Sequence, residues 1–148
     1  MLCIGNFDGG DPLVVRYNSG YGLYLNGDGK GNFVQKSATG SGFNVPGEGR
    51  GLACVAGSNG ATVIAANCNA AAASFQIRQQ PFRIGRANNY THGILHLGDG
   101  RTRRQECYWG GGYLSQSSQM LMLPSATATA ELYNGEKKMG EVKAKSEE

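Results

Sequence analysis

The chain has 148 residues, of which 40% are hydrophobic and 17% charged, enough for one domain or two very small ones with a modest core. The formal net charge of +3 is dispersed, so no basic stripe could neutralise several phosphates, and we expect no nucleic-acid partner. With 24 glycines and 4 prolines, the composition is typical of short strands joined by tight turns, and it argues against a disordered chain or a helical bundle.

Short apolar runs separated by Gly, Asn and Asp follow one another along the chain and predict β-strands. The predicted strands are 2–7, 13–17, 22–26, 33–36, 51–56, 62–67, 74–78, 94–97, 102–109, 119–123, 128–133 and 138–142. The alanine-rich segment 65–73 has helix propensity, but Asn67 and Asn69 interrupt it and no amphipathic stripe is present. Turn residues at 98–100 and 134–135 predict hairpins, so we expect an all-β fold of antiparallel sheets.

Two parts of the chain resemble known families. Gly-Gly-Gly-Tyr-Leu-Ser-Gln-Ser-Ser at 110–118 resembles the signature of the ASPIC/UnbV domain. Upstream, 23–50 resembles the blade segments of FG-GAP/VCBS-type β-propeller proteins, with Leu-Tyr-Leu-Asn-Gly-Asp-Gly-Lys-Gly-Asn-Phe followed by Gly-Phe-Asn-Val-Pro-Gly-Glu-Gly-Arg. The resemblance implies an FG-GAP/VCBS-like repeat region at 1–80 and an ASPIC/UnbV-like β domain at 81–148. Pro81, which cannot donate to a strand ladder, marks the expected boundary.

Length limits how far the propeller comparison extends. A blade takes roughly 40–50 residues and a closed ring needs at least about four blades, so the first 80 residues make fewer than two. We therefore expect incomplete propeller-like blades plus a small C-terminal β-sandwich or barrel domain. Strand edges left open by this arrangement must be covered within the chain or by other copies, which favours a homo-oligomer.

A possible metal site lies in the first loop, where Asn6, Asp8 and Asp11 resemble the Asp-rich calcium loop of FG-GAP and VCBS repeats. Calcium takes six to eight oxygen ligands, whereas only two of these residues carry charge and Pro12 occupies the region of the final ligand. The corresponding segment 56–61 has no carboxylate. An ordinary Asx/Gly turn is therefore the favoured interpretation, with calcium as the alternative and no other cofactor expected.

Aromatic side chains are the candidate contacts for a protein or carbohydrate surface, with core packing as the alternative for each. They are Tyr17, Tyr21, Tyr24, Tyr90 and Trp109. No nucleophile with a nearby base stands out, and His92 and His96 on one strand would lie roughly 13 Å apart, too far to share a metal ion. The sequence thus favours a non-enzymatic binding or assembly module, adhesive or structural; the alternative is a hydrolase domain acting on extracellular glycans.

The cysteines and the glycine-rich turn complete the expectations. Four widely spaced cysteines, Cys3, Cys54, Cys68 and Cys107, argue against a zinc site. Apolar runs around the first three predict buried free thiols, with one or two disulfides as the alternative. We expect the turn at 113–118 to be structural, with its Tyr packed and its Ser and Gln side chains satisfying backbone groups. The resemblance implies an extracellular or periplasmic location; no signal peptide is recognised, and no membrane insertion is expected.

Overall fold

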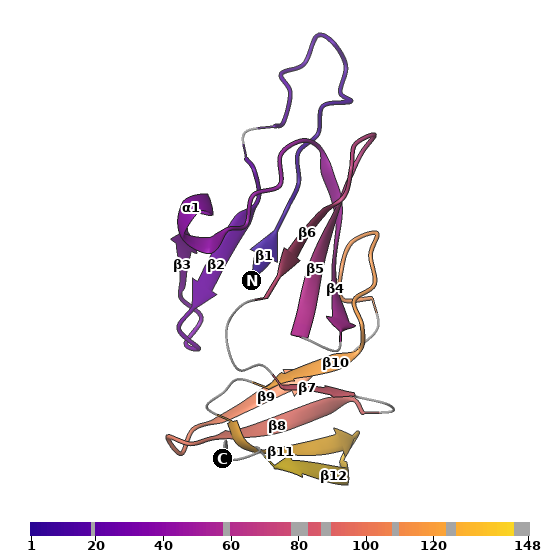
Figure 1. Cartoon of the computed structure of the whole chain (residues 1–148). Helices are drawn as coiled ribbons and strands as arrows, with labels where there is room; N and C mark the ends of the chain where they lie inside the picture. The colour runs from indigo at the N-terminus through magenta and orange to yellow at the C-terminus, as the bar shows by residue number, and fades with distance from the viewer. Residues whose placement is uncertain are drawn as a thin grey trace.

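The computed structural model describes residues 1–18, 20–57, 60–77, 90–107, 110–123 and 127–143, and the backbone of 83–86. In these residues every strand pairing is antiparallel, and one short helix is the exception to an all-β structure (Figure 1). None of the described sheets closes into a barrel. The predicted fold class is therefore confirmed at the level of antiparallel β-sheets. The expected domain boundary near residue 80 and the candidate Trp109 lie outside the described residues.

The first half of the chain forms two three-stranded sheets, in the orders β1-β2-β3 and β4-β5-β6. Their strands are β1 (Leu2–Cys3), β2 (Leu23–Gly27), β3 (Phe33–Lys36), β4 (Gly49–Gly57), β5 (Gly60–Asn67) and β6 (Ala73–Gln76). Asp28 shapes the β2–β3 hairpin, because its carboxylate accepts hydrogen bonds from the backbone N–H groups of Lys30 and Asn32 at 2.7 and 3.1 Å. Such Asx bonds are typical of tight turns.

The core of this half lies between the two sheets. Phe43 and Val45, which follow the helix α1 (Ala38–Ser41), pack with Val63 and Ala65 of β5. Partly buried apolar residues from all the surrounding strands extend this cluster: Leu2, Ile4, Tyr24, Leu52, Cys54, Ala73, Phe75 and Ile77. The connection after β3 thus supplies the largest buried ring of the half.

The second half forms a four-stranded sheet of order β12-β11-β8-β9 and a two-stranded ribbon of β10 and β7. Their strands are β7 (Arg83–Arg86), β8 (His92–Leu97), β9 (Thr102–Glu106), β10 (Met120–Leu123), β11 (Thr127–Asn134) and β12 (Lys137–Lys143). Leu121 and Leu123 of β10 pack with Leu95 of β8 and Leu132 of β11. In the amide orientation that satisfies both of its groups, the side chain of Gln105 bonds the N–H and C=O of Met122 at 3.0 Å each, which ties β9 to β10.

Most of the predicted strands are confirmed, but the segment 13–17 is not a strand. Asp11 turns the chain here, because its carboxylate accepts a bond from the N–H of Leu13 at 2.9 Å and its carbonyl one from the N–H of Val14 at 2.9 Å. Only Tyr17 pairs with another segment, through an isolated bridge to Phe7. The segment 13–17 therefore has the alternating pattern of a strand but forms a loop, because no edge of a sheet in the described part of the chain lies beside it.

Three smaller differences concern local structure. Neither β7 nor α1 was expected; α1 forms because Ser37 caps its start and Gly42, at φ 70°, ends it in the left-handed region. The last hairpin turns at 135–136, one residue later than expected, because Asn134 pairs with Lys137. The alanine-rich segment 65–73 is not helical, as expected: it comprises the end of β5, a turn and the start of β6.

Candidate functional site

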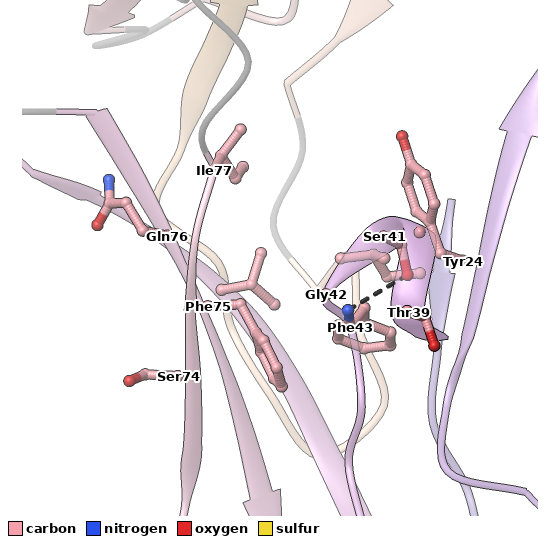
Figure 2. A pocket seen from close by; sticks show the side chains of 12 residues that line it. Tyr24, Thr39, Ser41, Gly42, Phe43, Ser74, Phe75, Gln76 and Ile77 are labelled. Carbon is pink, nitrogen blue, oxygen red and sulfur yellow. Dashed lines mark hydrogen bonds between the residues drawn. The ribbon is translucent and has the colours of Figure 1, made fainter. Parts of the chain in front are cut away.

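A cavity of about 670 Å³ opens between the two N-terminal sheets (Figure 2). One wall comes from β1, β2 and the α1 segment, and the other from β5 and β6. The lining residues are Leu2, Tyr24, Thr39, Gly40, Ser41, Gly42, Phe43, Val63, Ser74, Phe75, Gln76 and Ile77. None of them carries a charge, and the large ones other than Gln76 are apolar or aromatic. Such a lining suits a neutral, largely apolar occupant.

Local hydrogen bonds and one close approach fix the helical wall of the cavity. The Ser41 hydroxyl donates to the Ser37 carbonyl at 2.9 Å. It also accepts from the N–H of Phe43 at 3.2 Å, as Figure 2 shows. Gly22, at φ +94°, passes so close to the Phe43 ring that an added Cβ would lie 2.9 Å from it. The Phe43 ring in turn lies 4.9 Å from the Phe75 ring, centroid to centroid. The cavity is therefore built from segments far apart in the sequence.

The β6 strand borders the cavity with an open edge. The N–H of Ile77 bonds the Ala61 carbonyl at 3.0 Å, and in antiparallel pairing this register turns the main-chain groups of Phe75 toward β5 as well. The N–H and C=O groups of Ser74 and Gln76 consequently point away from β5. No described strand pairs with β6 on that side.

The opposite edge of the same sheet, at β4, is covered by the glycine-rich segment. Ser115 donates its hydroxyl proton to the Leu52 carbonyl at 2.7 Å, and Ser117 Oγ accepts from the N–H of Cys54 at 2.9 Å. Ser118 bonds Cys54 and Ala56 in the same way: its N–H donates to the Cys54 carbonyl at 2.8 Å and its Oγ accepts from the Ala56 N–H at 3.2 Å. We call residues 115–118 the serine clamp.

The expectation that serines of this turn satisfy backbone groups is thus confirmed, but the expected packing of Tyr113 is wrong. Its side chain is 80% exposed, because the turn directs it away from β4 and into solvent. Gly112 permits the tight approach instead: a Cβ there would lie 3.2 Å from the Leu52 carbonyl oxygen. The segment 112–118 therefore joins the two halves of the molecule.

The three calcium candidates already have protein partners. Asn6 is buried, and its amide nitrogen donates to the carbonyls of Gly20 and Gly47 at 2.6 and 2.9 Å, so it holds loops together. Asp8 accepts from the side-chain amide of Asn18 at 2.8 Å, whereas Asp11 accepts from its own turn. Among the described residues, no group of three or more His, Cys, Asp or Glu is placed to hold a metal ion.

The tyrosine candidates do not form one site. Tyr17 and Tyr21 are 66% and 62% exposed, near the first loop. Tyr24 is half-buried and lines the cavity, whereas Tyr90 is half-buried against the C-terminal core. The aromatic residues that do share the cavity with Tyr24 are Phe43 and Phe75. Sequence reasoning missed them because nothing in their spacing links residues that come from three separate segments.

The outer face of the C-terminal sheet carries a charged cluster around Glu131. Lys138 bonds its carboxylate, the Tyr133 hydroxyl donates to it at 3.0 Å, and His96 Nε2 lies 3.6 Å away. The Lys138 bond, followed by the Tyr133 bond, lowers the pKa of Glu131 despite an opposing contribution from burial. His92 instead stacks on Tyr133, with centroids 5.1 Å apart. The two histidines therefore have separate partners.

All four cysteines are free thiols, so the disulfide alternative is not realised. Cys107 is buried, and Cys3 and Cys54 are half-buried, but Cys68 is exposed, contrary to the expectation. The reason is that Cys68 follows the last residue of β5, where the chain turns outward. Burial raises the pKa of the Cys54 and Cys107 thiols, which disfavours thiolate chemistry at either.

No known protein family, curated protein or solved structure matches the chain. In the part of the chain that the structure describes, no helix is both long and apolar enough to cross a membrane.

Proposed function

We propose that the chain is a non-enzymatic binding or assembly module of a surface or secreted protein, and that it self-associates through β edges. The observation that carries the proposal is the open edge of β6 beside an uncharged, largely apolar cavity. Unpaired edges with apolar surroundings are sites of pairing with another chain, since each free N–H and C=O gains a partner there.

The distribution of charge over the strand edges supports this choice. The edge strands of the C-terminal sheet carry Arg103, Arg104 and Glu106 on β9, and Lys137, Lys138, Glu141 and Lys143 on β12. Charged edges resist pairing with another strand. The β6 edge has no charged residue, and β3 exposes Phe33 and Val34 at 54% and 64%. Association through the N-terminal half is therefore favoured.

The finer architecture belongs to the same proposal. We regard the two three-stranded sheets as incomplete propeller-like blades of the FG-GAP/VCBS kind, and the C-terminal half as a small ASPIC/UnbV-like β-sandwich. The order of strand, glycine-rich loop and strand in the sequence supports the comparison with propeller blades. An extracellular or periplasmic location follows from this resemblance alone.

The hydrolase alternative lacks support at the cavity. Thr39, Ser41 and Ser74 bring hydroxyl groups to its lining, but no histidine, carboxylate or lysine stands among the lining residues to act as a base. Tyr24 remains the one candidate from the sequence that lines this cavity, where a neutral sugar ring or an apolar side chain would contact it.

Light scattering coupled to size exclusion tests the proposal over micromolar concentrations. We expect species larger than the 15.6 kDa monomer, in amounts that rise with protein concentration. A single 15.6 kDa species throughout would contradict self-association. Binding to a glycan or protein array without turnover would support the binding role, whereas turnover lost in Ser41→Ala or Ser74→Ala would overturn the non-enzymatic assignment.

A further inference from the structure

The first loop contains an apolar strand pattern without a strand to pair with. Leu13 and Val15 are 95% and 85% exposed, more than any other large hydrophobic side chain in the described residues. Together with Tyr17, at 66%, they occupy alternate positions, the period that places side chains on one face of a strand. Val14 and Arg16 would form the other face. The loop that carries them extends from the end of the molecule opposite the C-terminal sheet (Figure 1).

The β6 edge offers what this segment lacks. Ser74 and Gln76 present main-chain donors and acceptors on the open side of β6, and the cavity beside them takes side chains from one face of an added strand. The Leu13, Val15 and Tyr17 face is uncharged, and so is the cavity lining. Apolar side chains that are exposed in the free chain would be buried when they enter the cavity. Burial of apolar surface is the main driving force for association.

We infer that residues 13–17 of one copy add as a strand to the β6 edge of a second copy and place alternate apolar side chains in its cavity. The inference rests on the proposed self-association and names its two surfaces. Donor and acceptor are different parts of the chain, so two assemblies are possible. Two copies that exchange loops reciprocally form a closed two-fold dimer, whereas unreciprocated contacts are heterologous and extend into a linear assembly. The Asp11 turn must open when the strand forms, which costs its two hydrogen bonds.

The competing edge is β3, where Phe33 and Val34 are also exposed. It is less suited for two reasons. It already forms a strand, so pairing there would give partners only to the groups of its own free edge, and β3 contributes no residue to the cavity lining. Val34 therefore provides the matched control, since it is an exposed valine on a free edge outside both proposed surfaces.

The experiment compares the wild type with one donor variant, two acceptor variants and the control by light scattering at equal concentrations. Val15→Lys places a charge on the donor face, and we expect the dissociation constant to rise by at least about tenfold. Ser74→Pro removes an N–H that points away from β5, and Thr39→Arg brings a charge to the cavity rim; both should have the same effect. Val34→Lys should associate like the wild type. As Val15 is exposed, its variant should keep its Tm within about 2 °C at dilutions where all are monomers.

A synthetic peptide of residues 11–18 provides a second measurement that needs no variant. Added in excess, it should dissociate wild-type oligomers, and a scrambled peptide should not. Wild-type assembly unchanged in Val15→Lys, or in both acceptor variants, would overturn the inference and leave the proposed function standing. Loss of assembly in Val34→Lys alone would assign it to β3, and equal action of both peptides would show an unspecific apolar site. A monomeric wild type would overturn both proposals.

Discussion

The two halves of the molecule differ in how their strand edges are protected from pairing with another strand. In the C-terminal half, a four-stranded sheet and a ribbon surround a core that includes the fully buried Leu95 and Leu121, and charged residues line both outer strands of the sheet. In the N-terminal half, the two sheets leave a cavity between them, one edge is capped by the serine clamp, and β6 is open.

This difference shows how a chain can use two ways of preventing edge pairing and still leave the β6 edge without either. Charged side chains resist pairing at β9 and β12 because an added strand would have to desolvate them. At β4, the clamp bonds the Leu52 carbonyl, both main-chain groups of Cys54 and the Ala56 N–H, so no further strand can bond these groups. The β6 edge has neither form of protection in the described residues, which is why the assembly proposal concerns this edge.

The largest effect should come from the C-terminal core. Leu121→Ala removes a side chain that is 1% exposed and packs on Gly93, where an added Cβ would lie 2.6 Å from Leu121 Cδ1. We expect a loss of about 2–5 kcal/mol in the free energy of unfolding, measured by urea denaturation. Leu114→Ala, the same change at a 75% exposed site, should alter it by less than about 0.5 kcal/mol. Equal effects would mean that Leu121 does not belong to a packed core.

The serine clamp should have the next largest effect, because it connects the halves. Ser117→Ala leaves the part-buried N–H of Cys54 without its acceptor, which should cost about 1 kcal/mol and speed hydrogen exchange at the Cys54 amide. Ser118→Ala should cost less, since the Ala56 N–H that it releases is exposed and can bond water. Unchanged exchange at Cys54 in Ser117→Ala would contradict the clamp.

A smaller effect should appear at the charged outer face. The pKa of Glu131 is lowered in the folded state from its ordinary value of 4.5, so the unfolded chain binds more protons as the pH falls. The resulting stabilisation is present above about pH 4.5 and is lost as the pH falls through the folded-state pKa. Lys138→Met should move the pKa of Glu131, measured by NMR titration, toward 4.5 and weaken this acid dependence of the Tm. Lys137→Met, on the opposite face of β12, is the control and should leave the Glu131 titration in place.

The smallest expected effect concerns calcium. Millimolar calcium should not raise the Tm, because Asn6, Asp8 and Asp11 already engage protein groups and only two of them are carboxylates. Magnesium at the same concentration controls for ionic strength. A calcium-specific rise that disappears in Asp8→Ala and Asp11→Ala would establish the site in the first loop.

Sequence reasoning succeeded for local properties and failed where a strand depends on a distant partner, in both halves of the molecule. Alternation and turn residues predicted nearly every strand, because side-chain period and turn chemistry are local properties. The same reasoning failed at 13–17, since a strand forms only where an edge is available to pair with. It also failed at β7, because the short sequence Arg-Ile-Gly-Arg is equally compatible with a loop. It forms a strand only by pairing with Met120–Leu123.

By itself, the sequence determined an all-β chain, the positions of its main hairpins, and a turn at 113–118 whose serines bond backbone groups. Only the tertiary structure decided which backbone groups those are, that Phe43, Phe75 and Tyr24 share a cavity, and that β6 keeps an open edge. The physical reason is that strand formation depends on neighbours in sequence, whereas edge coverage and cavities depend on which distant segments pack together. A local sequence pattern does not indicate which distant segments these are.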